Sequence, residues 1–215
     1  MRERQFIVVE GPIGVGKTSL ARLLAERFES QLVLETPDDN PYLQEFYKDP
    51  RKHAFLTQLS FLFMRYEQQQ GLTQGNLFHQ GGIVADYLFG KDRIFASVTL
   101  DDREWDLYNK ISQMLAPEVP EPDLVIYLQS DTDRLMENIA KRHRPAEEYI
   151  TRDYLQQLQE SYQEYFFQQH NNALLVINTT HLDFISQDED FEALVHQIKQ
   201  PFTGIRYYNP ADGMG

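Results

Sequence analysis

The chain has 215 residues, of which 41% are hydrophobic and 25% are charged, the proportions of an ordinary soluble globular protein. Nucleic-acid-binding proteins usually carry a basic face, so the net charge of -13 argues against a DNA or RNA partner. The absence of cysteine excludes disulfides, thiol catalysis and cysteine-bound metals, and it fits a cytoplasmic protein. We expect neither a membrane anchor nor a signal peptide, because no apolar run approaches the ~20 residues of a membrane span and residues 1–5 lead straight into a strand.

Short apolar runs alternate with longer amphipathic stretches along the chain. The runs are continuous rather than alternating, as in parallel strands that are covered on both faces. We predict strands at 6–9, 32–34, 83–85, 124–128 and 174–177. The pattern predicts an α/β protein with one doubly wound, five-stranded parallel sheet and helices on both faces.

Helices are expected between these strands. Helical spacing or start patterns place them at 17–28, from Asn40-Pro41, at 52–70, after the capping-box pattern of Asp101 and Glu104, after a similar pattern at Ser130 and Asp133, and after Thr151. Residues 1–200 are expected to form a single domain. Residues 201–215 show no clear period and are expected to be a C-terminal tail, loose or docked.

Residues 11–18 read GPIGVGKT, a full match to G-x-x-x-x-G-K-[ST] between a strand and a helix. The glycines of such a loop let backbone N–H groups surround phosphates, and the helix N-terminus adds a positive dipole. Lys17 is expected to reach the terminal phosphates and Thr18 to ligate Mg²⁺. The alternative is a glycine turn that only joins strand to helix. We predict ATP binding by Gly11, Pro12, Ile13, Gly14, Val15, Gly16, Lys17 and Thr18.

Glu35 follows the second predicted strand, at the edge of the sheet where ligands bind. A carboxylate there would repel an anionic acceptor and suits a neutral hydroxyl, whose proton it can accept. We therefore predict that the acceptor of the phosphoryl group is an alcohol. The alternatives are that Glu35 caps the next helix or pairs with an arginine.

Asp86 follows the third predicted strand, a position from which acidic side chains of phosphate-loop proteins hold Mg²⁺ directly or through water. The alternative is an acid that caps the next turn. We predict that Asp86 shares the metal with Thr18.

A basic cluster, Lys141 to Arg144, lies where a predicted helix ends at Pro145. Cations are favoured at helix C-termini, so a solvated helix end is the simpler interpretation. In an acidic protein with a phosphate-binding loop, arginines in such a loop can also close over the phosphates and neutralise their charge. We predict this basic lid, with Arg142 and Arg144 as catalytic residues.

Five sequence blocks now carry a resemblance: EGPIGVGKT, ETPDDNPYLQEFY, FLTQLSFLFMRY, IVADYLFGKDRIFA and KRHRPAEEY, in that order and over about two-thirds of the chain. The chain resembles the bacterial deoxynucleoside kinases of the deoxycytidine, deoxyguanosine and deoxyadenosine kinase family, most of all the deoxyguanosine kinase branch. The resemblance implies a P-loop kinase fold, the substrates ATP and a deoxynucleoside, Mg²⁺ as cofactor, and a homodimer formed through long helices.

The resemblance also implies residue roles. Glu35 matches the base that activates the 5'-hydroxyl, and Tyr47 and Glu147 match the pair that holds the 3'-hydroxyl. Residues that match contacts to the nucleobase are Gln58, Arg65, Phe95 and, with a one-residue gap, Asp92. Without the resemblance, Gln58 and Arg65 would be ordinary polar positions on one helix face, and Tyr47 and Phe95 core aromatics.

The chain departs from the family at two positions. Tyr87 stands where many relatives carry an arginine after the strand-edge acid, and Asn138 stands where some carry a further lid arginine. We predict ATP-dependent phosphorylation of the 5'-hydroxyl of a deoxynucleoside, with Lys17, Glu35, Asp86 and the lid arginines as catalytic residues. Guanine is the first choice of base and adenine the second, with cytosine open. The alternatives are a nucleoside monophosphate kinase and a P-loop regulator without catalysis.

Overall fold

The computed structural model describes residues 6–75, 82–168 and 173–210. Within these ranges the strands form one parallel sheet of six strands in the order β2-β3-β1-β4-β5-β6. Their bounds are β1 Phe6–Glu10, β2 Gln31–Val33, β3 Ile83–Ala85, β4 Leu124–Gln129, β5 Ala173–Asn178 and β6 Ile205–Tyr208. The prediction of a doubly wound parallel sheet is confirmed, and all strands therefore bring their carboxyl ends to one edge.

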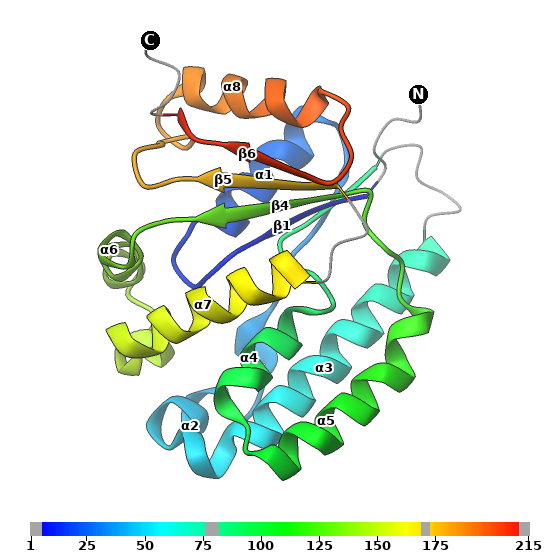
Figure 1. Ribbon diagram of the computed structural model, residues 1–215, viewed down its shortest axis with the longest axis vertical. Helices are drawn as coiled ribbons and strands as arrows, with labels where there is room; N and C mark the ends of the chain where they lie inside the picture. Colours follow the sequence, from blue (N-terminus) through cyan, green and yellow to red (C-terminus); the bar gives the residue numbers. More distant parts are fainter. Residues whose placement is uncertain (1–5, 76–81, 169–172, 211–215) are drawn as a thin grey trace.

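Helices cover both faces of the sheet (Figure 1). Alternate residues of β4 separate the two cores: Leu124 and Ile126 pack with α1 and α8, whereas Val125 and Tyr127 pack with α4 and α7. Both sets are fully buried, which explains why the strand sequences are continuously apolar. The long helices α3 and α5 lie beyond α4, on the same side of the sheet as α7 (Figure 1).

The helices link the strands as the sequence predicts, with corrections at their starts. Their bounds are α1 Lys17–Arg27, α2 Leu43–Lys48, α3 Pro50–Gly75, α4 Lys91–Thr99, α5 Asp102–Leu115, α6 Thr132–Arg142, α7 Arg152–Gln168 and α8 Asp188–Lys199, with 3₁₀ helices at Pro37–Asp39, Ala116–Glu118 and Pro145–Tyr149. The last residue of the predicted helix after Thr151, residue 169, lies outside the described residues.

The capping box at the start of α5 is confirmed, because Asp101 accepts from the N–H of Glu104 and the Glu104 carboxylate accepts from the N–H of Asp101. The prediction of a similar capping pattern at Ser130 and Asp133 is wrong. The N-cap of α6 is Asp131, and the Ser130 hydroxyl is buried instead of capping the helix.

The predicted helix start, with Asn40 as the cap and Pro41 as the first helical residue, is also wrong by two residues. The Asn40 side chain accepts from the N–H of Tyr42 and donates to the carbonyl of Thr57, so it fixes the turn that leads into α2 and ties this turn to α3. The helix itself begins at Leu43.

The prediction omits α4 and α8. The first is only nine residues long and contains the β-branched residues Ile94, Val98 and Thr99, which weaken its helical pattern. By contrast, α8 carries ordinary helix signals, with acids at 188–190 in its first turn.

The expected five-stranded sheet is wrong because residues 205–208 of the predicted tail form β6. This edge strand pairs with β5, and the N–H of Leu174 donates to the carbonyl of Gly204. Its residues are partly exposed, so it lacks the continuous apolar run that marks the inner strands. Residues 201–210 therefore dock on the sheet, and residues 211–215 lie outside the described residues.

Candidate active site

The glycine-rich loop connects β1 to α1 at the carboxyl edge of the sheet. Gly14 has a φ of 86°, and a Cβ there would lie 2.7 Å from the carbonyl oxygen of Leu135 on α6. A larger residue would be strained in this conformation and would also push α6 away. The loop is thus held tightly against the helix that leads into the lid.

Lys17 is the first residue of α1, and its Nζ donates to the carbonyls of Gly11 and Pro12 at 2.8 and 2.9 Å. Burial and, next, the nearby charge of Lys91 lower the pKa of Lys17 to about 8. A bound phosphate would favour the charged lysine by offering anionic oxygens in place of neutral carbonyls.

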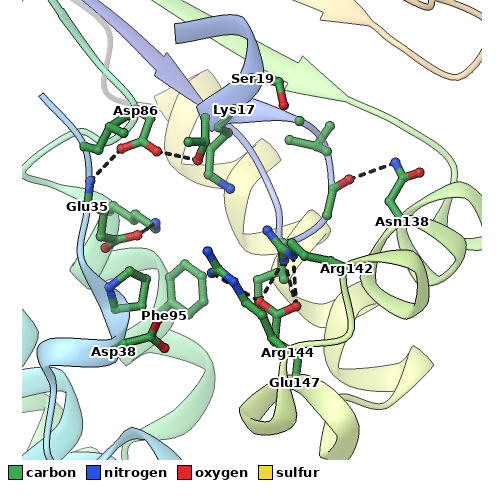
Figure 2. Close-up of a pocket in the computed structure, with 18 of the residues that line it drawn as sticks. Lys17, Ser19, Glu35, Asp38, Asp86, Phe95, Asn138, Arg142, Arg144 and Glu147 are labelled. Atoms are coloured by element: carbon green, nitrogen blue, oxygen red, sulfur yellow. Dashed lines mark hydrogen bonds and ion pairs between the residues drawn. The ribbon is translucent and has the colours of Figure 1, made fainter. Parts of the chain in front are cut away.

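Asp86 connects three elements at the sheet edge. Its carboxylate accepts from the Thr18 hydroxyl at 2.5 Å and from the Glu35 N–H at 2.7 Å (Figure 2). A hydroxyl and a single carboxylate that converge on one point fit Mg²⁺, which usually takes few protein ligands together with phosphate oxygens and water. In the described ranges, no three His, Asp or Glu side chains gather into a metal-binding group.

Glu35 lies two residues after the end of β2, with one carboxylate oxygen paired to Arg65 on α3 and the other to Lys91 on α4. Burial alone would raise the pKa of Glu35, but the charges of Arg65 and Lys91 outweigh burial and lower the pKa to about 2. The alternative that Glu35 pairs with an arginine is therefore realised. It does not remove Glu35 from the pocket, since its side chain remains 14% exposed there.

Arg65 is buried between Glu35 and Asp92, and it pairs with both carboxylates. Burial raises the pKa of Asp92 to about 6 although the Arg65 charge acts in the opposite direction. Gln58 lies on the same face of α3 and donates to the Thr99 hydroxyl at 3.3 Å. Oε1 of Gln58, Nε of Arg65 and Oδ2 of Asp92 are buried without a hydrogen-bond partner among the described residues, which marks a place for a polar ligand.

The lid lies across the pocket from this cluster. Arg142, at the end of α6, binds the Glu147 carboxylate through Nε and Nη2 at 3.1 and 2.7 Å, and Arg144 lies 3.7 Å from it. Tyr47 on α2 is partly buried, and its pKa is raised by burial and by the charge of Glu147. Tyr47 and Glu147, the two residues predicted to bind the 3'-hydroxyl, therefore lie close together, although Arg142 holds the Glu147 carboxylate.

A single pocket of about 540 Å³ collects these groups, a volume typical of small-molecule sites. Figure 2 shows Glu35, Asp38 and Phe95 on one side and Arg142, Arg144 and Glu147 on the other. Of the predicted site residues, all but Gly11 and Pro12 line the pocket: Ile13, Gly14, Val15, Gly16, Lys17, Thr18, Glu35, Tyr47, Gln58, Arg65, Asp86, Asp92, Phe95, Arg142, Arg144 and Glu147. Tyr47 and Phe95 are partly exposed there, so they are not simple core aromatics.

The pocket also contains residues that the sequence reasoning missed: Ser19, Arg22, Asp38, Lys91, Arg134, Tyr154, Asp183 and Phe184. Lys91 is the most buried cation among them. Its position in a conspicuous block, five residues after Asp86, was the available signal, but a lysine ahead of an unpredicted helix looks like a surface residue.

The two departures from the family have structural explanations. Tyr87 is fully buried, and its hydroxyl donates to Gln68 at 2.8 Å rather than lining the pocket. Asn138 donates to the carbonyl of Gly14 at 2.9 Å and so ties α6 to the phosphate loop (Figure 2).

Among the described residues, no helix is long and apolar enough to cross a membrane. The family model "Deoxynucleoside kinase" matches residues 7–203. The chain is 34% identical to the deoxyguanosine kinase of Bacillus subtilis over 93% of this chain and 99% of that protein, and 33% identical to the deoxyadenosine kinase of Lactobacillus acidophilus over 94% and 98%.

A solved structure of deoxyadenosine kinase from M. mycoides, with dCMP and dCDP bound, superposes with a TM-score of 0.78 at 25% identity, covering 89% of this chain and 97% of that one. A family match over nearly the whole chain, relatives above 30% identity and a shared fold agree with the phosphate loop and the pocket described above. The chain belongs to the deoxynucleoside kinase family, whose members transfer a phosphoryl group to a nucleoside hydroxyl.

Proposed function

We propose that this kinase transfers the γ-phosphoryl group of ATP to the 5'-hydroxyl of a purine deoxynucleoside, with deoxyguanosine preferred to deoxyadenosine. The carrying observation is the position of Glu35. Its carboxylate lies between the phosphate loop, which binds the donor, and the Gln58, Arg65 and Asp92 cluster, which reads the base of the acceptor.

The acceptor is held by its sugar and its base. Tyr47 and Glu147 bind the 3'-hydroxyl, so that the 5'-hydroxyl points to Glu35, which accepts its proton. Lys17 and the loop N–H groups hold the donor phosphates, and Arg142 and Arg144 neutralise the transferring group. Most of the rate enhancement comes from positioning and charge rather than from covalent steps.

Mg²⁺ is part of this proposal. Thr18 and Asp86 would hold the ion, which supplies positive charge to the donor phosphates when bound.

The preference for purines rests on the unpaired polar atoms of the base-reading cluster. Asp92 and the Gln58 amide offer acceptors and a donor that match the edge of guanine, and a turned amide suits adenine. Thymine offers less to Arg65, and a base that leaves buried polar groups unpaired is rejected steeply. Cytosine is the remaining competitor because it also presents an amine.

Steady-state kinetics with the four deoxynucleosides, ATP and Mg²⁺ tests this proposal. We expect kcat/KM to be highest for deoxyguanosine and next highest for deoxyadenosine. If thymidine is the best substrate, the assignment of the base-reading cluster is wrong.

We further propose a cytoplasmic homodimer. Exposed apolar side chains on α3 and α5, namely Leu56, Phe63, Leu107 and Met114, could form its interface. Light scattering at micromolar concentration should give twice the chain mass of 25.3 kDa.

A further inference from the structure

Lys91 is a buried cation that lines the pocket. It is the first residue of α4, its side chain is 7% exposed, and its Nζ pairs with the Glu35 carboxylate. Burying an ammonium group is costly unless the charge is used or compensated. Glu35 compensates the charge of Lys91, but the same carboxylate also compensates the charge of Arg65. One carboxylate thus faces two buried cations, which leaves Lys91 able to bind another anionic group.

The neighbours of Lys91 place it where donor and acceptor meet. On one side lies Glu35, and on another lies Lys17, whose charge interacts with that of Lys91. The ammonium also lies 5.7 Å from the centre of the Phe95 ring, which lines the acceptor side of the pocket. Lys91 therefore has the proposed general base Glu35, the donor-binding Lys17 and the acceptor-side Phe95 as neighbours. This position faces the path of the transferring phosphoryl group.

The two cations that pair with Glu35 differ in their freedom to move. Arg65 is held by Glu35 on one side and by Asp92 on the other, and its planar guanidinium is fixed between them. Lys91 has a flexible stem, and Glu35 is its ion-pair partner among the described residues. Lys91 can therefore exchange that carboxylate for another anionic oxygen, whereas Arg65 cannot do so without breaking a second pair.

We propose that Lys91 is a catalytic residue, which turns from Glu35 to the 5'-oxygen and the γ-phosphoryl oxygens when both substrates bind. This role rests on the proposed function, since it requires a hydroxyl acceptor at Glu35. The 5'-oxygen bonds to the γ-phosphorus while its proton passes to Glu35, and the bond from phosphorus to the bridging oxygen breaks, with its electron pair leaving on ADP. Lys91 stays protonated throughout and donates hydrogen bonds to the charge that develops.

A structural role makes a different prediction. If Lys91 only neutralises Glu35 and anchors α4, a neutral substitution should lower stability and nucleoside affinity and leave the rate of transfer from bound substrates near that of wild type. If Lys91 acts on the phosphoryl group, a substitution should lower kcat. Only a side chain that carries a positive charge at the same distance from the backbone should restore kcat.

The absence of cysteine makes this distinction practical, because Lys91→Cys introduces the chain's single thiol. The thiol is alkylated with 2-bromoethylamine, which gives a lysine analogue with sulfur in its stem, or with iodoacetamide, which gives a neutral adduct of similar size. Alkylation in denaturant followed by refolding gives access to the buried site, and mass spectrometry confirms one adduct. Lys110→Cys, at an exposed position of α5, receives both reagents as the matched control.

Single-turnover transfer from ATP to deoxyguanosine, deoxyguanosine affinity and Tm are measured for each form. We expect Lys91→Cys to lose ~10²-fold in transfer rate, the typical effect of one lost donor to a developing charge, with affinity within ~3-fold of wild type. The cationic adduct should recover at least tenfold, and the neutral adduct should not. Lys91→Gln, which keeps a polar side chain of similar reach, should show the same loss if the cysteine variant does not refold.

Three results would overturn the catalytic role: a transfer rate within ~3-fold of wild type in Lys91→Gln, equal recovery by both adducts, or a loss confined to affinity and Tm. Failure of the proposed function looks different, because the wild-type protein would then transfer no phosphate to any deoxynucleoside.

Discussion

The two sides of the pocket hold their charges in different ways. On the acceptor side, Arg65 and Asp92 are 4% and 1% exposed, and their pairing is set by helices α3 and α4. On the lid side, Arg142 is 36% exposed and lies at the end of a helix, so its pair with Glu147 is more open to solvent than the Arg65–Asp92 pair. The buried side is organised before substrate arrives, whereas the lid can rearrange around the phosphates.

The difference also explains a conflict within the lid. Glu147 is the predicted partner of the 3'-hydroxyl, yet Arg142 holds it through two nitrogen atoms. Binding of the sugar would compete for Glu147, and the freed Arg142 would then be available to the phosphates. Substitutions on the buried side should therefore have local effects, and substitutions in the lid should have effects that depend on both substrates.

The largest expected effect is that of Lys17→Ala at the phosphate loop, which serves both sides of the pocket. Phosphoryl transfer should be abolished, because the substitution removes the lysine charge that acts on the donor phosphates, while Tm should stay near that of wild type. Lys110→Ala serves as the matched control at an exposed position. A variant with wild-type turnover would show that the glycine-rich loop does not bind the donor.

Glu35→Gln keeps the shape of the side chain and removes the base. We expect a ~10²–10⁴-fold loss in kcat, the usual contribution of a general base, with nucleoside binding largely kept. Rapid-quench measurement of the chemical step decides the outcome, and an unchanged rate would leave Glu35 with the ion-pair role alone.

In the lid, Arg142→Ala should reduce the single-turnover rate by at most ~10²-fold, less than the loss of the base. Because the substitution also frees Glu147, the KM for deoxynucleoside should fall or stay the same rather than rise. A rise in that KM would mean that Arg142 positions Glu147 for the sugar, which would contradict the proposed competition.

The smallest effect concerns Asp92 and carries a pH dependence. Its folded-state pKa is raised to about 6, so the carboxylate gains a proton and loses its charge as pH falls through 6. We expect kcat/KM for deoxyguanosine to fall as pH is lowered through this range. Asp92→Asn should lower kcat/KM ~10–100-fold at pH 7.5, the typical cost of a lost hydrogen bond to a charged group. The variant should also lose the dependence of kcat/KM on pH in this range.

Stability should follow the opposite trend with pH. Because the folded pKa is raised, the stability contributed by protonated Asp92 is present below pH ~4 and is lost as pH rises through about 6. Asp92→Asn should therefore gain Tm relative to wild type as pH rises from 4 to 7. A constant difference in Tm would show that Arg65 compensates the carboxylate completely.

The sequence by itself determined the parts that depend on local pattern. The glycine-rich loop predicts its own conformation, because residues such as Gly14 tolerate a positive φ that other residues rarely adopt. Continuous apolar runs predict buried parallel strands, and the strand ends at Glu35 and Asp86 follow from those runs. The family resemblance then indicated Gln58, Arg65 and Glu147, which the structure brings into one pocket.

Tertiary structure decided what depends on long-range partners. β6 is an exposed edge strand whose position is fixed by pairing with β5, and no local pattern marks it. Lys91 looks like a surface lysine until α3, α4 and the end of β2 meet and bring its ammonium to Glu35. The two cations that pair with Glu35 lie 30 and 56 residues away along the chain, and burial and Coulomb interactions act through space rather than along the chain.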